Sequence, residues 1–165
     1  MSMDIRRERP GDEAEIADII TAAFAKAQHS SGTEATIVSG LREAGALSLS
    51  LVAVEGGAVI GHVAFSPVEI AEATGAWYGL GPVAVSPLRQ RHGIGGALIE
   101  EGLAQLRASG AAGAVVLGDP GFYHRFGFAS DGGLRFGEVP PAYLQWLAFA
   151  AAAPRGELRY HPAFG

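Results

Sequence analysis

A glycine-rich turn between a short apolar run and a helical pattern constrains this chain most. The run Val83–Val85 is typical of the end of a buried strand, and Ser86-Pro87 stops it. The turn Gln90–Gly96 places glycines where a backbone can approach a ligand closely. Because a helix starts there, unpaired N–H groups and the helix dipole favour phosphate. With Arg89, Arg91 and His92 nearby in an acidic chain, the sequence predicts a phosphate-binding loop.

The spacing of the glycines decides which kind of phosphate loop this is. A Walker A loop needs Gly-Lys followed by Ser or Thr, and the chain contains no such triplet. A dinucleotide-binding loop needs G-x-G-x-x-G directly after the strand, whereas this turn has G-x-G-G. The pattern that fits is Gln-x-x-Gly-x-Gly at Gln90, Gly93 and Gly95, which resembles the central motif of the GNAT superfamily of acyl-CoA-dependent N-acetyltransferases. A tight turn at a helix start is the alternative interpretation of so short a pattern.

A second segment, Gly118–Phe128, is similar to another part of the same family. In GNAT proteins a short helix carrying Phe-Tyr ends in Gly-Phe, and here Phe122 and Tyr123 precede Gly127 by the matching spacing. Phe122 and Phe126 stand one helical turn apart, and Gly127 is placed as a C-cap. The resemblance implies that Tyr123 is the general acid. For an isolated tyrosine, a half-buried core position would be the simpler interpretation.

The resemblance also implies the co-substrate, acetyl-CoA, and no metal. Main-chain groups of the strand would bind the pantetheine arm, and N–H groups of the turn would bind the pyrophosphate. The residues that it assigns to the cofactor are Val83, Ala84, Val85, Arg91, His92, Gly93, Ile94, Gly95 and Gly96. Many members carry an Asn seven residues before the tyrosine, where this chain has Val116. Asp119 is a candidate replacement for that contact.

The general base has three candidates in the sequence. An ammonium substrate must lose a proton before attack, and Glu69, His62 and Glu34 carry groups that could accept it. Each also has a structural interpretation, as a solvated surface acid for the two glutamates and as a hydrogen-bonded strand residue for the histidine. His124 lies beside Tyr123 but faces about 100° away on a helix, so it is expected in solvent.

The order of apolar patterns predicts the fold. An α/β protein of the α+β type is expected, with the GNAT fold: a central mixed, mostly antiparallel twisted sheet flanked by helices, in a single domain over residues 1–165. Strands are predicted over 4–9, 47–54, 58–70, 77–85 and 114–117, and helices from Asp12, Thr33 and Gly95, the first two capped by those side chains. The tail predicts strands over 139–146 and 158–161, with a possible helix over 148–153. Segments such as 61–66 and 80–85 are similar to the YhbS-like branch of predicted bacterial acetyltransferases.

Composition limits the classes of partner. Of the 165 residues 48% are hydrophobic, which indicates a globular protein, and the net charge of −5 argues against nucleic acid. Cysteine is absent, so the chain has no disulfide and no catalytic thiol. The apolar stretch 146–153 is too short to span a membrane, and the N-terminus has no signal-peptide pattern. A cytoplasmic location is expected.

The predicted activity is transfer of an acetyl group from acetyl-CoA to a primary amine of a small molecule or of a peptide or protein terminus. The alternatives are a non-catalytic acyl-CoA-binding sensor or assembly module and, less well supported, a nucleotide-phosphate binder. The first two helices and the loop Gln28–Gly32 are expected to overhang the acyl group, which favours small or flexible substrates. The tail residues Tyr143, Trp146, Leu147 and Phe149 suggest a homodimer, although they could equally complete the monomer core.

Overall fold

The computed structural model describes residues 3–25 and 32–165, which form two compact units. The first unit comprises Met1–Phe65, Gly81–Gly102 and Ala163–Gly165, and the second comprises Ser66–Leu80 and Leu103–Pro162. Two strands and one helix contribute residues to both units.

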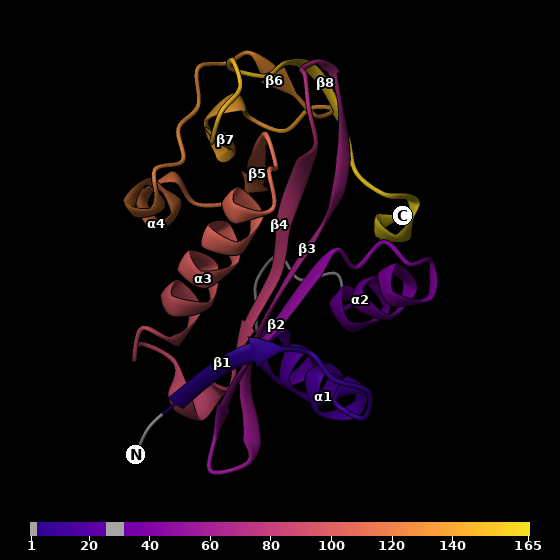
Figure 1. Ribbon diagram of the computed structural model, residues 1–165, viewed down its shortest axis with the longest axis vertical. Coiled ribbons are helices and arrows are strands. Elements are labelled where there is room, and N and C mark those ends of the chain that lie inside the picture. The colour runs from indigo at the N-terminus through magenta and orange to yellow at the C-terminus, as the bar shows by residue number, and fades with distance from the viewer. Residues whose placement is uncertain (1–2, 26–31) are drawn as a thin grey trace. The chain divides into compact units, whose positions relative to one another are not determined.

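The described residues contain eight strands, which make a mixed sheet, and four α-helices (Figure 1). In chain order they are β1 (Met3–Arg7), α1 (Glu13–Phe24), α2 (Glu34–Glu43), β2 (Leu49–Glu55), β3 (Ala58–Glu72), β4 (Trp77–Val85), α3 (Ile94–Ala108), β5 (Gly113–Leu117), α4 (Pro120–Tyr123), β6 (Leu134–Arg135), β7 (Leu144–Ala148) and β8 (Arg155–Arg159). This order agrees with the one predicted from the sequence as far as β5 and α4.

The first unit is built on an antiparallel ladder. β1 pairs with β2 and β2 pairs with β3, with Arg6 opposite Val52 and Val52 opposite His62. The β2–β3 turn has positive φ at Gly56 (59°) and Gly57 (81°), as a tight hairpin requires. The predicted hairpin is therefore confirmed.

Helices cover both faces of this ladder. The apolar stripe of α1 buries Ile16 and Ile20, which pack in one cluster with Val52 of β2 and Ala64 of β3, and α1 also packs against α2 (Figure 1). Phe65, one residue further along β3, points to the other face and lies under Gly102 of α3. The apolar faces predicted for α1 and α3 from their hydrophobic periodicity are therefore the faces that are buried in the core.

The second unit has its own apolar core. β4 is parallel to β5, β5 is antiparallel to β7, and β3 is antiparallel to β8, which pairs in parallel with the short β6. Trp77, Val115, Leu144 and Leu158, each from a different strand, are buried together in its centre.

The tail departs from the sequence prediction. Residues 139–146 were expected as one strand, but Pro140 and Pro141 lead into a short 3₁₀ turn, because proline lacks the N–H that a ladder needs, and β7 starts at Leu144. The predicted helix over 148–153 is wrong, since Ala148 still pairs with Gly113 and bends follow it. The last strand covers Arg155–Arg159 rather than 158–161.

Two predicted helix caps have the right position but not the predicted bond. Asp12 and Thr33 precede α1 and α2, yet neither side chain makes a capping hydrogen bond. Asp12 instead accepts from Arg6 at 2.7 Å and from the Arg9 N–H at 2.7 Å. Its carboxylate is therefore used to join α1 to β1.

The described residues bear on three further sequence predictions, which concern the overhanging loop, a membrane span and a metal site. Residues 28–31 of the predicted overhanging loop lie outside the described residues. Within the described part, no helix is long and apolar enough to cross a membrane. The same part contains no group of three or more His, Asp or Glu side chains arranged to hold a metal ion.

Candidate active site

The predicted phosphate loop of the first unit is closed by the glutamine of its motif. Gln90 donates from Nε2 to the Val85 carbonyl oxygen at 3.2 Å, so its side chain ties the turn to the end of β4. Arg91 (φ 70°) and Gly93 (φ 76°) both adopt left-handed backbone conformations before α3 starts. A Cβ on Gly93 would meet nothing within 4 Å, so the loop presents bare backbone to open space at that position.

The first turn of α3 supplies the donors that the sequence predicted. Ala97 N–H bonds to the Gly93 carbonyl at 3.0 Å, which begins the helical ladder. By helix geometry, the N–H groups of Ile94, Gly95 and Gly96 have no partner inside the helix. Gly95 lies close to β4, where an added Cβ would be 3.6 Å from Val85 Cγ2. The turn therefore offers consecutive donors beside the strand.

The basic residues of the loop are not equivalent. Arg89 is ion-paired with Glu55 at 2.6 Å, so its charge is already balanced by the β2–β3 hairpin. Arg91 and His92 are exposed. Of the three basic residues in the prediction, these two have side chains in solvent where an anion could meet them.

Tyr123 lies at the end of β5 in the second unit. A Cβ on Gly118, the residue after β5, would be only 2.5 Å from Tyr123 Cε2, so the ring lies directly on the backbone there. Phe122 and Phe128 pack edge-on against it, with ring centroids 4.9 and 6.0 Å away. Burial raises the pKa of Tyr123, which keeps its phenol protonated at neutral pH. The ring is thus both tightly held and supplied with a transferable proton.

The rest of the aromatic segment has the predicted shape. Phe122 and Phe126 are in ring contact at 5.4 Å, and Gly127 has φ 97° at the end of the turn, as a C-cap requires. Asp119 caps α4 by accepting from the Gly121 N–H at 2.9 Å. His124 is exposed, as predicted.

The three base candidates lie in different surroundings. Glu69 is on β3 opposite Arg159, with both side chains about 80% exposed, as expected of a solvated surface acid. Glu34 begins α2. His62 is completely buried on β3, where burial lowers its pKa to about 4, so that it is neutral at pH 7. Its structural interpretation as a hydrogen-bonded strand residue is confirmed.

His62 ends a polar network that the sequence analysis missed. Arg42 of α2 donates to Glu8 at 2.7 and 2.9 Å, Ser50 donates to the same carboxylate at 2.7 Å, and His62 Nε2 lies 2.8 Å from Ser50 Oγ. Burial favours protonation of Glu8, but the bonds from Arg42 and Ser50 outweigh it and lower its pKa. Because Ser50 gives its proton to Glu8, His62 Nε2 must carry the hydrogen of the third bond.

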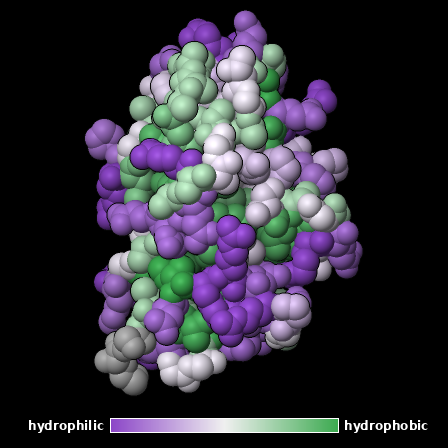
Figure 2. Space-filling view, in the orientation of Figure 1, coloured by the Kyte–Doolittle hydropathy of each residue, from purple (hydrophilic) through white to green (hydrophobic). Residues whose placement is uncertain are grey.

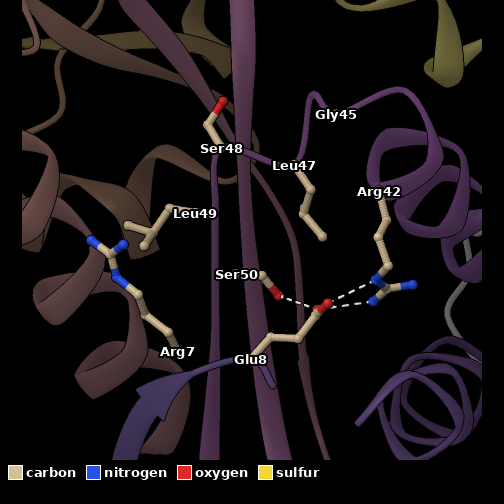
Figure 3. Close-up of a pocket in the computed structure, with 8 residues that line it drawn as sticks. All are labelled: Arg7, Glu8, Arg42, Gly45, Leu47, Ser48, Leu49 and Ser50. Carbon is tan, nitrogen blue, oxygen red and sulfur yellow. Dashed lines mark hydrogen bonds and ion pairs between the residues drawn. The ribbon is translucent and has the colours of Figure 1, made fainter. Parts of the chain in front are cut away.

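This network borders a surface pocket of about 280 Å³ in the first unit (Figure 3). Figure 3 shows Glu8 held between Ser50 and Arg42, while Arg7 points away from it. The carboxylate is fully engaged by its partners, so the pocket offers no uncompensated acid. No sequence signal marks this network, because residues that bond to each other in it are separated by up to 42 positions in the chain.

Taken separately, the two units supply different chemical groups. The first has a backbone donor loop suited to a phosphate, and the second has a tightly held, protonated phenol. An acyl transfer from a thioester needs both kinds of group, since the cofactor must be bound and its leaving thiolate must be protonated.

Comparison with known proteins finds a matching family and several relatives. The family described as "Acetyltransferase (GNAT) domain" matches residues 4–130. The chain is 42% identical over 127 residues to the Escherichia coli K12 protein named "Uncharacterized N-acetyltransferase YhbS", covering 76% of this chain and 73% of that protein.

Two solved structures are similar over nearly the whole chain. One is a GNAT family acetyltransferase from Brucella melitensis in complex with acetyl-CoA, at 54% identity and a TM-score of 0.89, covering 99% of both chains. The other is YhbS from Escherichia coli in complex with CoA, at 36% identity and a TM-score of 0.85, covering 98% of this chain and 91% of that one. The predicted fold, a mixed sheet of α/β class flanked by helices, is confirmed. The chain belongs to the GNAT acetyltransferase family.

Proposed function

We propose that this protein transfers the acetyl group of acetyl-CoA to a primary amine of a small molecule or of a peptide or protein terminus. The observation that carries the proposal is the similarity over 99% of the chain to a GNAT acetyltransferase crystallised with acetyl-CoA. A cytoplasmic location, where acetyl-CoA is available, belongs to the same proposal, and cell fractionation tests it.

Acetyl-CoA is proposed to bind along β4 and the loop that follows it. The N–H groups of Ile94, Gly95 and Gly96, together with Arg91, His92 and Gly93, would hold the pyrophosphate. The pantetheine arm would run beside Val83, Ala84 and Val85 and bond to their main chain as an added strand does. Only Trp77–Gly79 of β4 pair with β5. Residues 83–85 lie outside that pairing, which supports a pantetheine arm bound to their main chain.

Tyr123 is proposed as the general acid. The amine nitrogen attacks the thioester carbonyl directly, the carbon–sulfur bond breaks, and the phenol of Tyr123 gives its proton to the departing sulfur. Its raised pKa and its close packing on Gly118 support this role. We assign no general base, because Glu69 is in open solvent and His62 has no exposed surface.

Binding is tested by isothermal titration with acetyl-CoA and with ATP. Wild-type protein should bind acetyl-CoA, and Gly93→Leu should abolish binding, because its side chain enters the open space over the loop. The φ of 76° at Gly93 strains any residue that has a side chain. The second variant is therefore Gly95→Ala, because a Cβ at Gly95 would lie 3.6 Å from Val85 Cγ2, an ordinary contact distance. Wild-type affinity in both folded variants would contradict the assigned loop, and preferential ATP binding would favour the nucleotide-binding alternative.

Catalysis is tested by CoA release in a broad screen of amines. The Tyr123→Phe variant should lose about 10²- to 10⁴-fold in kcat while binding acetyl-CoA normally. Tyr143→Phe, which changes an exposed tyrosine, is the matched control. Acetyl-CoA binding without CoA release on any amine would favour the sensor or assembly module. A Tyr123→Phe variant with wild-type kcat would show that this tyrosine only packs.

A further inference from the structure

Gln145 of β7 is a fully buried polar side chain of the second unit. It is only 1% exposed, and its direct partner in the ladder, Val116 of β5, is equally buried. A buried carboxamide costs free energy unless it is hydrogen-bonded, whereas an apolar side chain of similar size carries no such cost. Gln145 Nε2 donates to the carbonyl oxygen of Gly118 at 3.2 Å. The bond to Gly118 is therefore the contact that accounts for a glutamine at this position.

The Gly118 carbonyl needs this donor because its ladder donor is engaged elsewhere. The Gly118 N–H bonds to the Tyr143 carbonyl at 3.0 Å, so these residues form a hydrogen-bonded pair, which in a regular antiparallel ladder exchanges two bonds. The Tyr143 N–H instead bonds to the Pro140 carbonyl at 3.0 Å, at the 3₁₀ turn Pro141–Tyr143. The side chain of Gln145, two residues further along β7, takes the place of that main-chain donor.

Gly118 is also the residue on which the ring of Tyr123 rests. A Cβ on Gly118 would be 2.5 Å from Tyr123 Cε2 and 3.2 Å from its Cδ2, so only glycine leaves room for the ring. Direct partners in a ladder point to the same face, as do residues i and i+2 of a strand, so Val116, Gly118 and Gln145 share one face. The carboxamide of Gln145 and the ring of Tyr123 therefore meet the Gly118 backbone from the same face of β5.

The chain leads directly from Gly118 into the helix that carries Tyr123. The Gly118 carbonyl and the Asp119 nitrogen belong to one planar peptide unit, so a bond that holds the carbonyl fixes the direction in which the chain leaves β5. The Asp119 carbonyl then accepts from the Tyr123 N–H at 3.1 Å, and the Asp119 side chain accepts from the Gly121 N–H at 2.9 Å. The Gly118 peptide thus sets both the support of the Tyr123 ring and the start of α4.

We propose that Gln145 is a positioning residue for Tyr123, which holds the Gly118 peptide so that the phenol stays aimed at the sulfur of acetyl-CoA. This inference rests on the proposed function. There the amine nitrogen forms the amide bond, the carbon–sulfur bond breaks, the sulfur takes the Tyr123 proton, and the phenolate recovers the proton that the new amide nitrogen releases. Gln145 exchanges no proton. Its contribution is orientation, and a misplacement of a reacting group by about 1 Å can cost about 10²-fold in rate.

The test is a double-mutant cycle between Gln145→Met and Tyr123→Phe, measured as kcat for CoA release. Methionine fills the space of glutamine without an N–H donor, so Gln145→Met should lower kcat about 10- to 100-fold and leave the KM for acetyl-CoA unchanged. In the Tyr123→Phe background no phenol is left to aim, and the same change should lower kcat by no more than about twofold. Gln105→Met, the same substitution in α3, is the matched control and should leave kcat unchanged in both backgrounds.

The cycle separates a failure of this inference from a failure of the proposed function. If Gln145→Met has the wild-type kcat, or lowers kcat by the same factor in both backgrounds, Gln145 only supports the fold and the inference is overturned, while Tyr123 keeps its role. If Tyr123→Phe keeps the wild-type kcat, or if no amine gives CoA release, the proposed function fails and the inference fails with it. Should Gln145→Met not fold, Gln145→Asn, whose carboxamide is one methylene too short to reach Gly118, takes its place in the cycle with the same expected outcomes.

Discussion

The buried His62 should make the stability of the fold depend on pH in a defined window. Its side chain has no exposed surface, and burial lowers its pKa from 6.5 to about 4. In the unfolded chain the same imidazole takes a proton near pH 6.5. As pH falls below that value the unfolded state binds more protons than the folded state, so the free energy of unfolding decreases. The decrease in the free energy of unfolding levels off once pH falls below the pKa of His62 in the folded state.

The magnitude follows from the difference between the two pKa values. That difference corresponds to about 3 kcal/mol in total, most of which is lost by pH 4.5. Glu8 contributes little in this window, because its pKa is lowered from 4.5 and its stabilising effect persists until pH falls below that ordinary value. Between about pH 6.5 and pH 4.5, His62 should therefore dominate the decrease.

Urea unfolding between about pH 7 and pH 4.5 measures this effect. The His62→Gln variant keeps an N–H donor for Ser50 but has no titratable ring, so its free energy of unfolding should be nearly constant over the same window. The control is His124→Gln, at an exposed histidine, which should keep the full wild-type decrease. A wild-type curve that is flat in this window, or an equal slope in the His62→Gln variant, would refute the reasoning.

The remaining predictions concern packing, assembly and substrate. Gly102→Ala should lower the free energy of unfolding by about 1 kcal/mol. The new Cβ would overlap the buried ring of Phe65, 2.6 Å from Cζ. The cost of this overpacking outweighs the gain of about 1 kcal/mol in helix propensity. Gly40→Ala in α2, where the nearest atom is the Ala163 Cβ at 3.3 Å, should instead be neutral or slightly stabilising in thermal unfolding. Light scattering at micromolar concentration should detect a homodimer, and a monomer mass at every concentration, with and without acetyl-CoA, would contradict it. Amine screening should find free amines or peptides among the substrates, whereas exclusive acetylation of a folded protein lysine would count against the proposed substrate class.

The surface bears on the homodimer prediction without testing it. Leu117 and Tyr143 are exposed apolar side chains of the second unit, while Trp146 packs against its core and Phe149 lies under the Arg107 guanidinium at 4.8 Å. The face shown in Figure 2 has hydrophilic and hydrophobic residues interspersed. Part of the apolar tail is therefore used inside the monomer, and the dimer stays a prediction.

Local features of the fold could be predicted because they depend on neighbours in the chain. The turn at Gly56-Gly57, the start of α3 after Gly93 and the C-cap at Gly127 each follow from what glycine permits and other residues do not. The same holds for the apolar stripe of α1. The tail was mispredicted where Pro140 and Pro141 interrupted an apolar pattern, since local hydrophobicity alone ignored their missing N–H groups.

The sequence by itself determined the glycine loop, the aromatic segment with Tyr123, and the family that these motifs resemble. Only the tertiary structure decided which groups are free to act: Arg89 is balanced by Glu55, His62 is buried and neutral, and Gln145 is brought to the end of β5. The reason is that turns and helix ends are set by backbone preferences over a few residues, whereas burial and pairing depend on residues far apart in the chain. Arg42 and Glu8, separated by 34 positions, are joined only once α2 packs beside the first strands.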